Sequence, residues 1–243
     1  MSRELEEARY ELAVANRIVA HEGVLDAFGH ISMRHPLHSD RYLLARSRGP
    51  ELVESTDVFE FTLDSQPVTP IDGALYGERV IHGCIYQSRP DVNAVCHHHS
   101  PAILPYCVAE VPLVAVYHQG ATMGSRAPVW DSRTEFGNTN LMVVAPEEGM
   151  SLARALGTHW IVLMRRHGAT VVGTNVRECV FRSIYSHRNA EIQWKAQVLG
   201  KIHPLNEAET ELAGPYNLRP LPIGRAWEYW TRRLDKAGEL PAR

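Results

Sequence analysis

The chain has 243 residues, of which 44% are hydrophobic and 22% charged, and its formal net charge is −3. These values are typical of a soluble enzyme built from one large domain or two small ones. The 25 Lys and Arg residues are scattered, and no apolar run approaches the ~20 residues that span a bilayer. The acidic N-terminal segment is unlike a signal peptide. We therefore expect a cytoplasmic protein that binds neither nucleic acid nor membrane.

The N-terminal part of the chain predicts a helix followed by strands. Apolar residues recur at helical spacing through residues 3–22, and Gly23 is typical of a helix end. A short strand is expected in FGHISMRHP, and two more strands are expected over residues 42–46 and 58–64. The next segment, SQPVTPIDG, is rich in turn-forming residues.

The remainder alternates between helices and strands. We expect helices over residues 76–88, 147–156 and 175–201, and strands over 93–99, 112–120, 141–145, 160–166 and 168–173. No repeat or flexible linker interrupts this order. The sequence therefore predicts one α/β domain over residues 1–243, with a sheet that need not be parallel. The tail, about residues 204–243, is expected to add a last helix.

Histidine is unusually frequent, with 13 residues, and three of them are consecutive. His97 and His99 are two apart on a predicted strand, so both side chains lie on one face, whereas His98 points to the other face. His167 also ends an apolar strand, and Gly168 after it allows close backbone packing. Three neutral imidazoles suit one divalent ion, namely Zn, Mn, Fe or Co, and leave positions open for substrate.

Each of these histidines also has a simpler interpretation. A His-x-His pair arises by chance, and a histidine at a strand end is often only half-exposed. His118 sits at the end of another predicted strand and is interpreted as a substrate contact or, alternatively, as a fourth ligand. Glu78 lies on the helix before the histidine strand; it is either a solvated carboxylate or a general acid/base near the metal. The four cysteines form no CxxC pair and are expected to be reduced and buried.

Several of these segments together resemble the class II aldolase/adducin family. The family pattern of a Glu, a helix closed by Tyr, and "rPdv-AVvH-Hs" matches Glu78 through RVIHGCIYQSRPDVNAVCHHHSP. RRHGATVVG matches the hairpin that carries the third histidine, and GHISMR matches an upstream element. The resemblance covers about residues 5–200. It implies a central, mostly antiparallel sheet flanked by helices, a metal held by the three histidines, Glu78 as acid/base, and a homotetramer or larger homo-oligomer.

The departures from the sugar-phosphate members of that family are equally informative. Those members have Asn where this chain has His30, and they bind phosphate through two elements that read ARSRGP and ALYGE here. GHIS, the Ser47-Arg48 pair, VYH and the YSHRNAEIQWKAQVLG segment resemble instead a branch that decarboxylates ortho-hydroxylated aromatic or pyridine carboxylates. A related branch includes a non-haem iron oxygenase.

The resemblance predicts a metal-dependent, non-oxidative decarboxylase of a small aromatic carboxylate. Arg48 and Arg34 are candidates to hold a second substrate carboxylate, with Ser47 beside them, because arginine binds carboxylates bidentately. The alternative interpretation of both arginines is a solvated surface side chain or a structural ion pair. His30 is either a catalytic group or a buried, hydrogen-bonded histidine. Tyr185 is either a pocket-closing residue from a neighbouring subunit or a core residue.

Three rival functions remain at this point. An aldolase or epimerase of the same family would act on a sugar or sugar phosphate, and an oxygenase would require Fe(II) and O2. A non-catalytic, adducin-like protein is expected to lose the metal histidines, which this chain keeps.

Overall fold

The centre of the molecule is a seven-stranded sheet with the order β3-β2-β1-β4-β7-β6-β5. The computed structural model describes residues 2–242. Every neighbouring pair of strands is antiparallel except β5 and β6, which are parallel. The strands are β1 (His30–Arg34), β2 (Arg41–Ala45), β3 (Val58–Thr62), β4 (Ala94–His98), β5 (Val129–Trp130), β6 (Ile161–Met164) and β7 (Gly168–Gly173). The predicted α/β fold with a mostly antiparallel sheet is confirmed.

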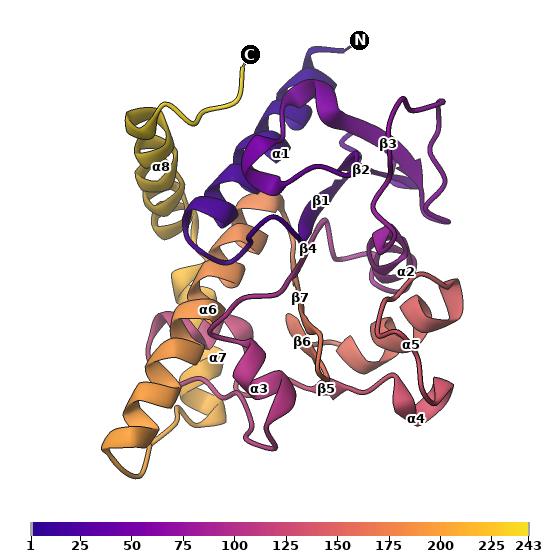
Figure 1. Cartoon of the computed structure of the whole chain (residues 1–243). Coiled ribbons are helices and arrows are strands. Elements are labelled where there is room, and N and C mark those ends of the chain that lie inside the picture. Colours follow the sequence, from indigo (N-terminus) through magenta and orange to yellow (C-terminus); the bar gives the residue numbers. More distant parts are fainter. Residues whose placement is uncertain (1, 243) are drawn as a thin grey trace.

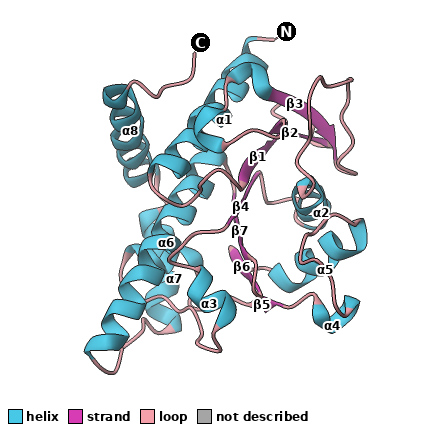
Figure 2. Cartoon of the chain, in the orientation of Figure 1, coloured by secondary structure: helices cyan, strands magenta, loops and turns pink. Residues whose placement is uncertain are grey.

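Helices cover both faces of this sheet (Figures 1 and 2). One layer contains α1, α6 and α8, and the opposite layer contains α2 and α5. The α-helices are α1 (Arg3–His21), α2 (Arg79–Ser88), α3 (Leu104–Val108), α4 (Arg133–Phe136), α5 (Pro146–Leu156), α6 (Val176–Leu199), α7 (Glu207–Asn217) and α8 (Pro220–Ala237). Three 3-10 helices, Pro50–Leu52, Ser55–Asp57 and Gln119–Met123, lie in the connections.

The two apolar cores follow from the alternation of side chains along the strands. On β2, Leu43 packs into the core under α1 and α6, whereas Tyr42 and Leu44 pack into the core under α2 and α5. On β4, Cys96 faces the first core and Val95 the second. This alternation directs the next residue along β4, His97, toward the α2 layer.

Helix α1 forms for the reasons that its sequence suggests. The Ser2 side chain accepts a hydrogen bond from the backbone N–H of Leu5 at the N-terminus, and the apolar positions of the helix are buried. The helix ends at His21, and Gly23 after it has a φ of 74°. Such a φ is costly for residues with a Cβ, so glycine suits this helix end.

The strand predicted over residues 112–120 does not form. Apart from an isolated bridge at Val114, this segment is irregular, and it continues into the 3-10 helix Gln119–Met123. Side chains of α6 form the hydrogen bonds that a neighbouring strand would otherwise form with this backbone. Asn189 bonds the backbone of Val114 and Val116, and Gln193 also bonds the Val114 N–H. Apolar alternation alone could not reveal that polar side chains would satisfy this backbone.

The strand predicted over residues 141–145 is also wrong. Leu141 has a φ of 69°, and the backbone N–H groups of Val144 and Ala145 bond the Glu148 carboxylate at the start of α5. The segment is therefore a loop that caps a helix. The short strand β5, which lies parallel to β6, was not predicted.

The C-terminal tail contains two helices where one was expected. Helix α7 ends at Asn217, and Pro220 begins α8. Trp230 and Leu234 of α8 are buried in the core with residues of α1 and α6. The tail thus completes one helical layer.

Across residues 2–242, no helix has both the length and the apolar character needed to cross a membrane.

Candidate metal centre

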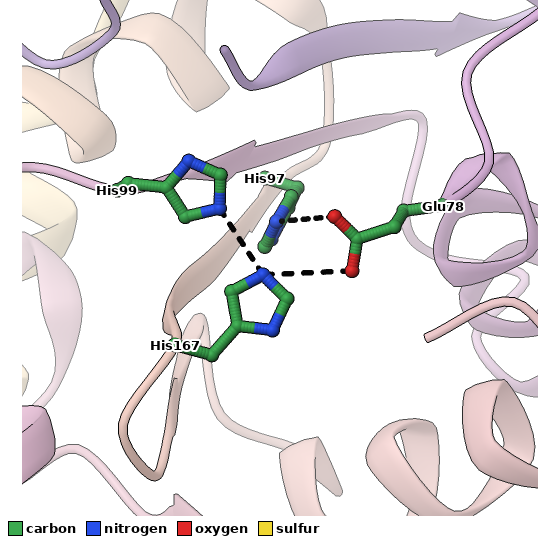
Figure 3. Close-up of side chains that lie close together, drawn as sticks. All are labelled: Glu78, His97, His99 and His167. Atoms are coloured by element: carbon green, nitrogen blue, oxygen red, sulfur yellow. Dashed lines mark hydrogen bonds and ion pairs between the residues drawn. The ribbon is translucent and has the colours of Figure 1, made fainter. Parts of the chain in front are cut away.

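Four side chains converge at the end of β4 (Figure 3). His97 lies in β4, His99 is the residue just after this strand, and Glu78 precedes α2. His167 lies in the turn between β6 and β7. One potential ligand atom from each of the four residues lies within 4.8 Å of the others. The structure therefore brings together the three predicted metal histidines and the predicted acid/base.

His98 lies on the opposite face of the strand. It is fully buried, and its Nδ1 accepts a hydrogen bond from the Ser100 N–H. Ser100 in turn contacts His187 of α6. The alternation along β4 thus separates His98 from His97, as the sequence predicted.

The histidine nitrogens and the carboxylate oxygens face one another closely. Nε2 of His99 and Nε2 of His167 are 3.1 Å apart. Nε2 of His97 lies 3.4 Å from Oε2 of Glu78, and Nε2 of His167 lies 3.5 Å from Oε1 of Glu78. A divalent cation between these atoms would relieve the repulsion of so many acceptors.

Hydrogen bonds on the far side of two imidazoles set their tautomers. Nδ1 of His167 lies 2.7 Å from the carbonyl oxygen of Leu141, so Nδ1 carries the proton. Nδ1 of His97 lies 3.4 Å from Oγ1 of Thr170, whose hydroxyl donates to the sulfur of Met164. In the neutral rings, both Nε2 atoms are therefore bare and face the cluster, which is how histidines bind metals.

The site fits a divalent ion by this chemistry. Nε2 of His97 is buried and has no hydrogen-bond partner among residues 2–242. Burial lowers the pKa of His99 to about 4, with help from His97 and His167, so this ring is neutral near pH 7. Burial also acts to lower the pKa of His167, but Glu78 raises it overall. A proton on His167 or a cation at the centre would balance the negative carboxylate.

The position of Glu78 depends on the loop after α4. Glu78 is the residue just before the first turn of α2, which begins at Arg79. Its Oε1 accepts a hydrogen bond of 3.0 Å from the backbone N–H of Val143. Burial acts to raise the pKa of Glu78, but His97 and His167 lower it well below its usual range. Glu78 is thus an ionised, oriented carboxylate beside the three imidazoles.

Sequence and structure comparisons agree with this arrangement. Residues 10–194 match the Class II Aldolase and Adducin N-terminal domain. The chain belongs to this family. The decarboxylase tropJ of Talaromyces stipitatus is 33% identical over 237 residues, which cover 88% of this chain and 89% of that protein. The 3,4-dihydroxyphthalate decarboxylase of Arthrobacter keyseri is 30% identical over 252 residues, which cover 95% of each protein.

The fold comparison points the same way. The aldolase II superfamily protein from Pseudomonas syringae matches with a TM-score of 0.81 and 20% identity, covering 99% of this chain and 96% of that one. The fold is therefore that of class II aldolases. The decarboxylase relatives confirm the predicted enzyme class, a carboxy-lyase, and support the aromatic decarboxylase branch of the family.

His30 lies next to the candidate metal centre of this class II aldolase fold. It pairs with His97 across β1 and β4, and the two rings are 5.4 Å apart. Its Nδ1 lies 2.6 Å from Nε2 of His82 on α2. Burial, together with His82 and His97, lowers the pKa of His30 well below its usual value. His30 is therefore a buried, neutral, hydrogen-bonded group that also borders the site.

Ser47 and Arg48 lie in a segment whose backbone contacts Tyr76, which in turn contacts His30. The Arg48 backbone bonds the Tyr76 hydroxyl, and the Tyr76 ring lies 4.4 Å from that of His30. The Arg48 guanidinium forms an ion pair with Asp57, which also binds Arg46. Ser47 is exposed. Arg48 thus has one carboxylate partner within the chain.

The guanidinium of Arg34 is held by hydrogen bonds to the surrounding backbone. Its guanidinium donates to the backbone carbonyls of Ser39, Tyr86, Arg89 and Val92 and to the Asn93 side chain. It also lies 4.9 Å above the Tyr86 ring. Because carbonyl groups occupy its donors, we leave Arg34 out of the proposed substrate site.

His118 and Tyr185 lie among C-terminal helices. The His118 carbonyl accepts a hydrogen bond from Asn217 of α7, and its ring lies 6.2 Å from that of Tyr216. The Tyr185 ring contacts Phe181 and Trp230. The cluster of four converging ligand atoms contains neither residue.

Two backbone groups and one side chain of the site were not anticipated. The Leu141 carbonyl, the Val143 amide and the Thr170 hydroxyl all orient the converging residues. For Thr170 the signal lies in the pairing of β4 with β7, whose register places it opposite His97. The Leu141 carbonyl and the Val143 amide are backbone groups, so the types of these residues do not indicate their roles.

We expect Thr170→Val to weaken metal binding by about 10- to 100-fold, because the histidine orientation supplied by the hydroxyl is lost. Metal affinity, measured by competition with a chromogenic chelator, checks this. Thr210→Val is a matched control, because the Thr210 hydroxyl donates to the Asn206 carbonyl at the start of α7 and lies outside the cluster. Equal affinities for both variants would contradict this role of Thr170.

We expect Gly168→Ala to destabilise the protein by about 1–3 kcal/mol. A Cβ at this position would lie 2.3 Å from the His98 carbonyl oxygen and 2.9 Å from the His99 ring, so the histidine strand must shift. Urea unfolding checks the stability. The control is Gly224→Ala in α8, where a Cβ meets nothing within 4 Å. That change should be neutral or stabilising.

Proposed function

We propose that this carboxy-lyase removes CO2 from an ortho-hydroxylated aromatic or heteroaromatic carboxylate and depends on one divalent metal ion per subunit. 3,4-Dihydroxyphthalate and 3-hydroxy-2-methylpyridine-4,5-dicarboxylate represent the substrate class. The observation that carries the proposal is the convergence of three imidazoles and one carboxylate in a chain with decarboxylase relatives. Mn, Zn, Fe and Co all suit this donor set.

The chemistry of the site follows from the electron pair that CO2 leaves behind. The ring carbon that bears the carboxylate is protonated first, so when the carbon–carbon bond breaks, this pair enters the ring and is shared with the hydroxyl oxygen on the neighbouring carbon. The bound cation supplies Lewis acidity that stabilises negative charge on that oxygen. His97, His99 and His167 would hold the cation, and their other ring atoms are fixed by the surrounding chain.

Glu78 is the group we assign to proton transfer. Because its carboxylate is ionised, it first accepts the proton of the substrate hydroxyl and then donates it to the ring carbon, after which CO2 leaves. Solvent returns a proton to the hydroxyl oxygen afterwards, so charge and atoms balance. The hydrogen bond from Val143 holds one carboxylate oxygen and leaves the other directed toward the cluster.

The substrate contacts in this proposal come from several segments. His30 borders the candidate metal centre, and the Arg48 backbone is linked to His30 through Tyr76. Ser47 precedes Arg48 in the chain and would contact substrate beside it. Arg48 would bind a second carboxylate by sharing or exchanging its Asp57 partner. His118 and Tyr185 would contact substrate from a neighbouring subunit of a homotetramer or larger assembly. We place this enzyme in the cytoplasm, in the catabolism of aromatic compounds.

An assay with a small panel of acids tests the proposal. We expect CO2 release from ortho-hydroxylated aromatic dicarboxylates and none from the same acids without the hydroxyl group. Phosphosugars serve as the alternative substrates of an aldolase or epimerase, and anaerobic incubation distinguishes an oxygenase. Cleavage of a phosphosugar without CO2 release, or a requirement for O2, would contradict the decarboxylase.

A further inference from the structure

A chain of four buried polar side chains runs from the interior of the protein to the metal centre. Nδ1 of His30 lies 2.6 Å from Nε2 of His82, and Nδ1 of His82 lies 2.6 Å from Oγ of Ser32. Oγ of Ser32 lies 2.8 Å from the Tyr86 hydroxyl. Each of the four residues is at most 3% exposed. Polar groups buried this deeply in a core must find partners.

The geometry of two elements produces this chain. His30 and Ser32 are two apart on β1 and share a face, and His82 and Tyr86 are four apart on α2 and share a face. Helix α2 packs over this face of the sheet, so the side chains interleave. The chain begins at Tyr86 and ends at His30, whose ring lies 5.4 Å from that of His97.

Only one direction of hydrogen bonding satisfies every hydroxyl group in the chain. If Tyr86 donates to Ser32 and Ser32 donates to Nδ1 of His82, then Nε2–H of His82 donates to Nδ1 of His30. Three of the four protons then fill the three contacts, and the fourth, on Nε2 of His30, lies outside them. In the reverse direction the fourth proton is that of the Tyr86 hydroxyl, which is enclosed in the core and has no other acceptor among residues 2–242. Because Nε2 of His30 is not fully enclosed, and a buried donor without an acceptor is destabilising, the first direction is favoured.

We propose that Tyr86, Ser32 and His82 are positioning residues that hold His30 in its Nε2–H tautomer, ready to donate a hydrogen bond to an anionic oxygen of a ligand at the metal centre. Nε2 of His30 forms no hydrogen bond with the chain over residues 2–242, so this donor is available. The choice of ligand rests on the proposed function, because a carboxylate or phenolate oxygen is the acceptor that such a substrate offers. The direction of the hydrogen bonds from Tyr86 to His30 does not depend on the proposed function.

The tautomers can be observed directly by NMR of protein labelled with 15N in its histidines. Zinc-loaded and metal-free protein are both diamagnetic and suit the measurement. His30→Gln and His82→Gln variants assign the two rings. We expect both rings to carry their proton on Nε2. A proton on Nδ1 of His30 would overturn the proposal, whatever reaction the enzyme catalyses.

Ser32 variants test whether the chain sets the tautomer. Ser32→Ala removes the donor to Nδ1 of His82, so we expect a mixture of His30 tautomers, and Ser32→Thr should restore one. Tyr42→Phe is the matched control. Tyr42 is buried in the same core, and its ring is stacked 6.3 Å from that of His82, but its hydroxyl bonds Ser65 and the Arg79 carbonyl. An unchanged tautomer in Ser32→Ala would contradict the positioning role.

Binding of salicylate, the simplest ortho-hydroxybenzoate, to the zinc-loaded protein tests the ligand contact. We expect His30→Phe to weaken binding by about 10- to 100-fold, as for the loss of one hydrogen bond to a charged group. Ser32→Ala should weaken binding in the wild type but not in the His30→Phe background, because it acts through His30. Additive effects would overturn this coupling. Absence of salicylate binding would count against the proposed function, whereas the NMR result alone decides the direction of the chain.

Discussion

Removal of the metal should abolish CO2 release, and His97→Ala should produce the same loss by preventing metal binding. His97 contributes a buried Nε2 that has no hydrogen-bond partner among residues 2–242, so the alanine variant lacks one of three imidazole ligands. The Lewis acidity of a bound cation lowers a barrier by several kcal/mol. This corresponds to a loss of at least about 10³-fold in kcat/KM, at 1.36 kcal/mol for each tenfold change.

Metal content by mass spectrometry and CO2 release by a coupled assay check this expectation. Wild-type protein treated with a chelator should recover activity when Mn, Zn, Fe or Co is added back, and the most effective ion identifies the metal. His159→Ala is the control, because His159 is exposed and lies outside the cluster. Full activity in metal-free protein would refute the metal dependence.

The convergence of the site could be predicted because it depends on local geometry and on recognisable segments. Residues two apart on a strand share a face, and this rule correctly grouped His97 with His99 and separated His98. His167 is distant in sequence. Its position at a strand end made it a candidate, and the resemblance of its hairpin to a known family placed it with the others. The same resemblance implied the mostly antiparallel sheet, which residue patterns had left open.

The parts that could not be predicted depend on backbone groups and on distant partners. The loop over residues 141–145 has the apolar pattern of a strand, yet its backbone carbonyl and amide orient His167 and Glu78. Arg34 matches a family element, but four carbonyl groups, one at Ser39 and three at and after the end of α2, occupy its guanidinium. No residue type encodes which carbonyls will face an arginine, so a substrate role and a structural role look alike in the sequence.

Glu78→Gln should retain the metal but lower kcat by about 10²–10⁴-fold, the usual contribution of a general acid or base. The amide oxygen of glutamine can still accept the hydrogen bond from Val143. The amide cannot take the proton of the substrate hydroxyl or deliver it to the ring carbon. KM should change little, because this interaction acts in the transition state.

Two measurements on this variant separate the possible roles of the carboxylate. Glu60→Gln is the control, since Glu60 is a partly buried carboxylate on β3 that pairs with Arg41. A wild-type kcat in Glu78→Gln would remove Glu78 from the proton transfer. Loss of the metal together with activity would make Glu78 a fourth ligand, a role that its distances of 3.4 Å to His97 and 3.5 Å to His167 also allow. Retained metal with a slow kcat is the result that assigns the proton to Glu78, because the three imidazoles would then hold the ion without its carboxylate.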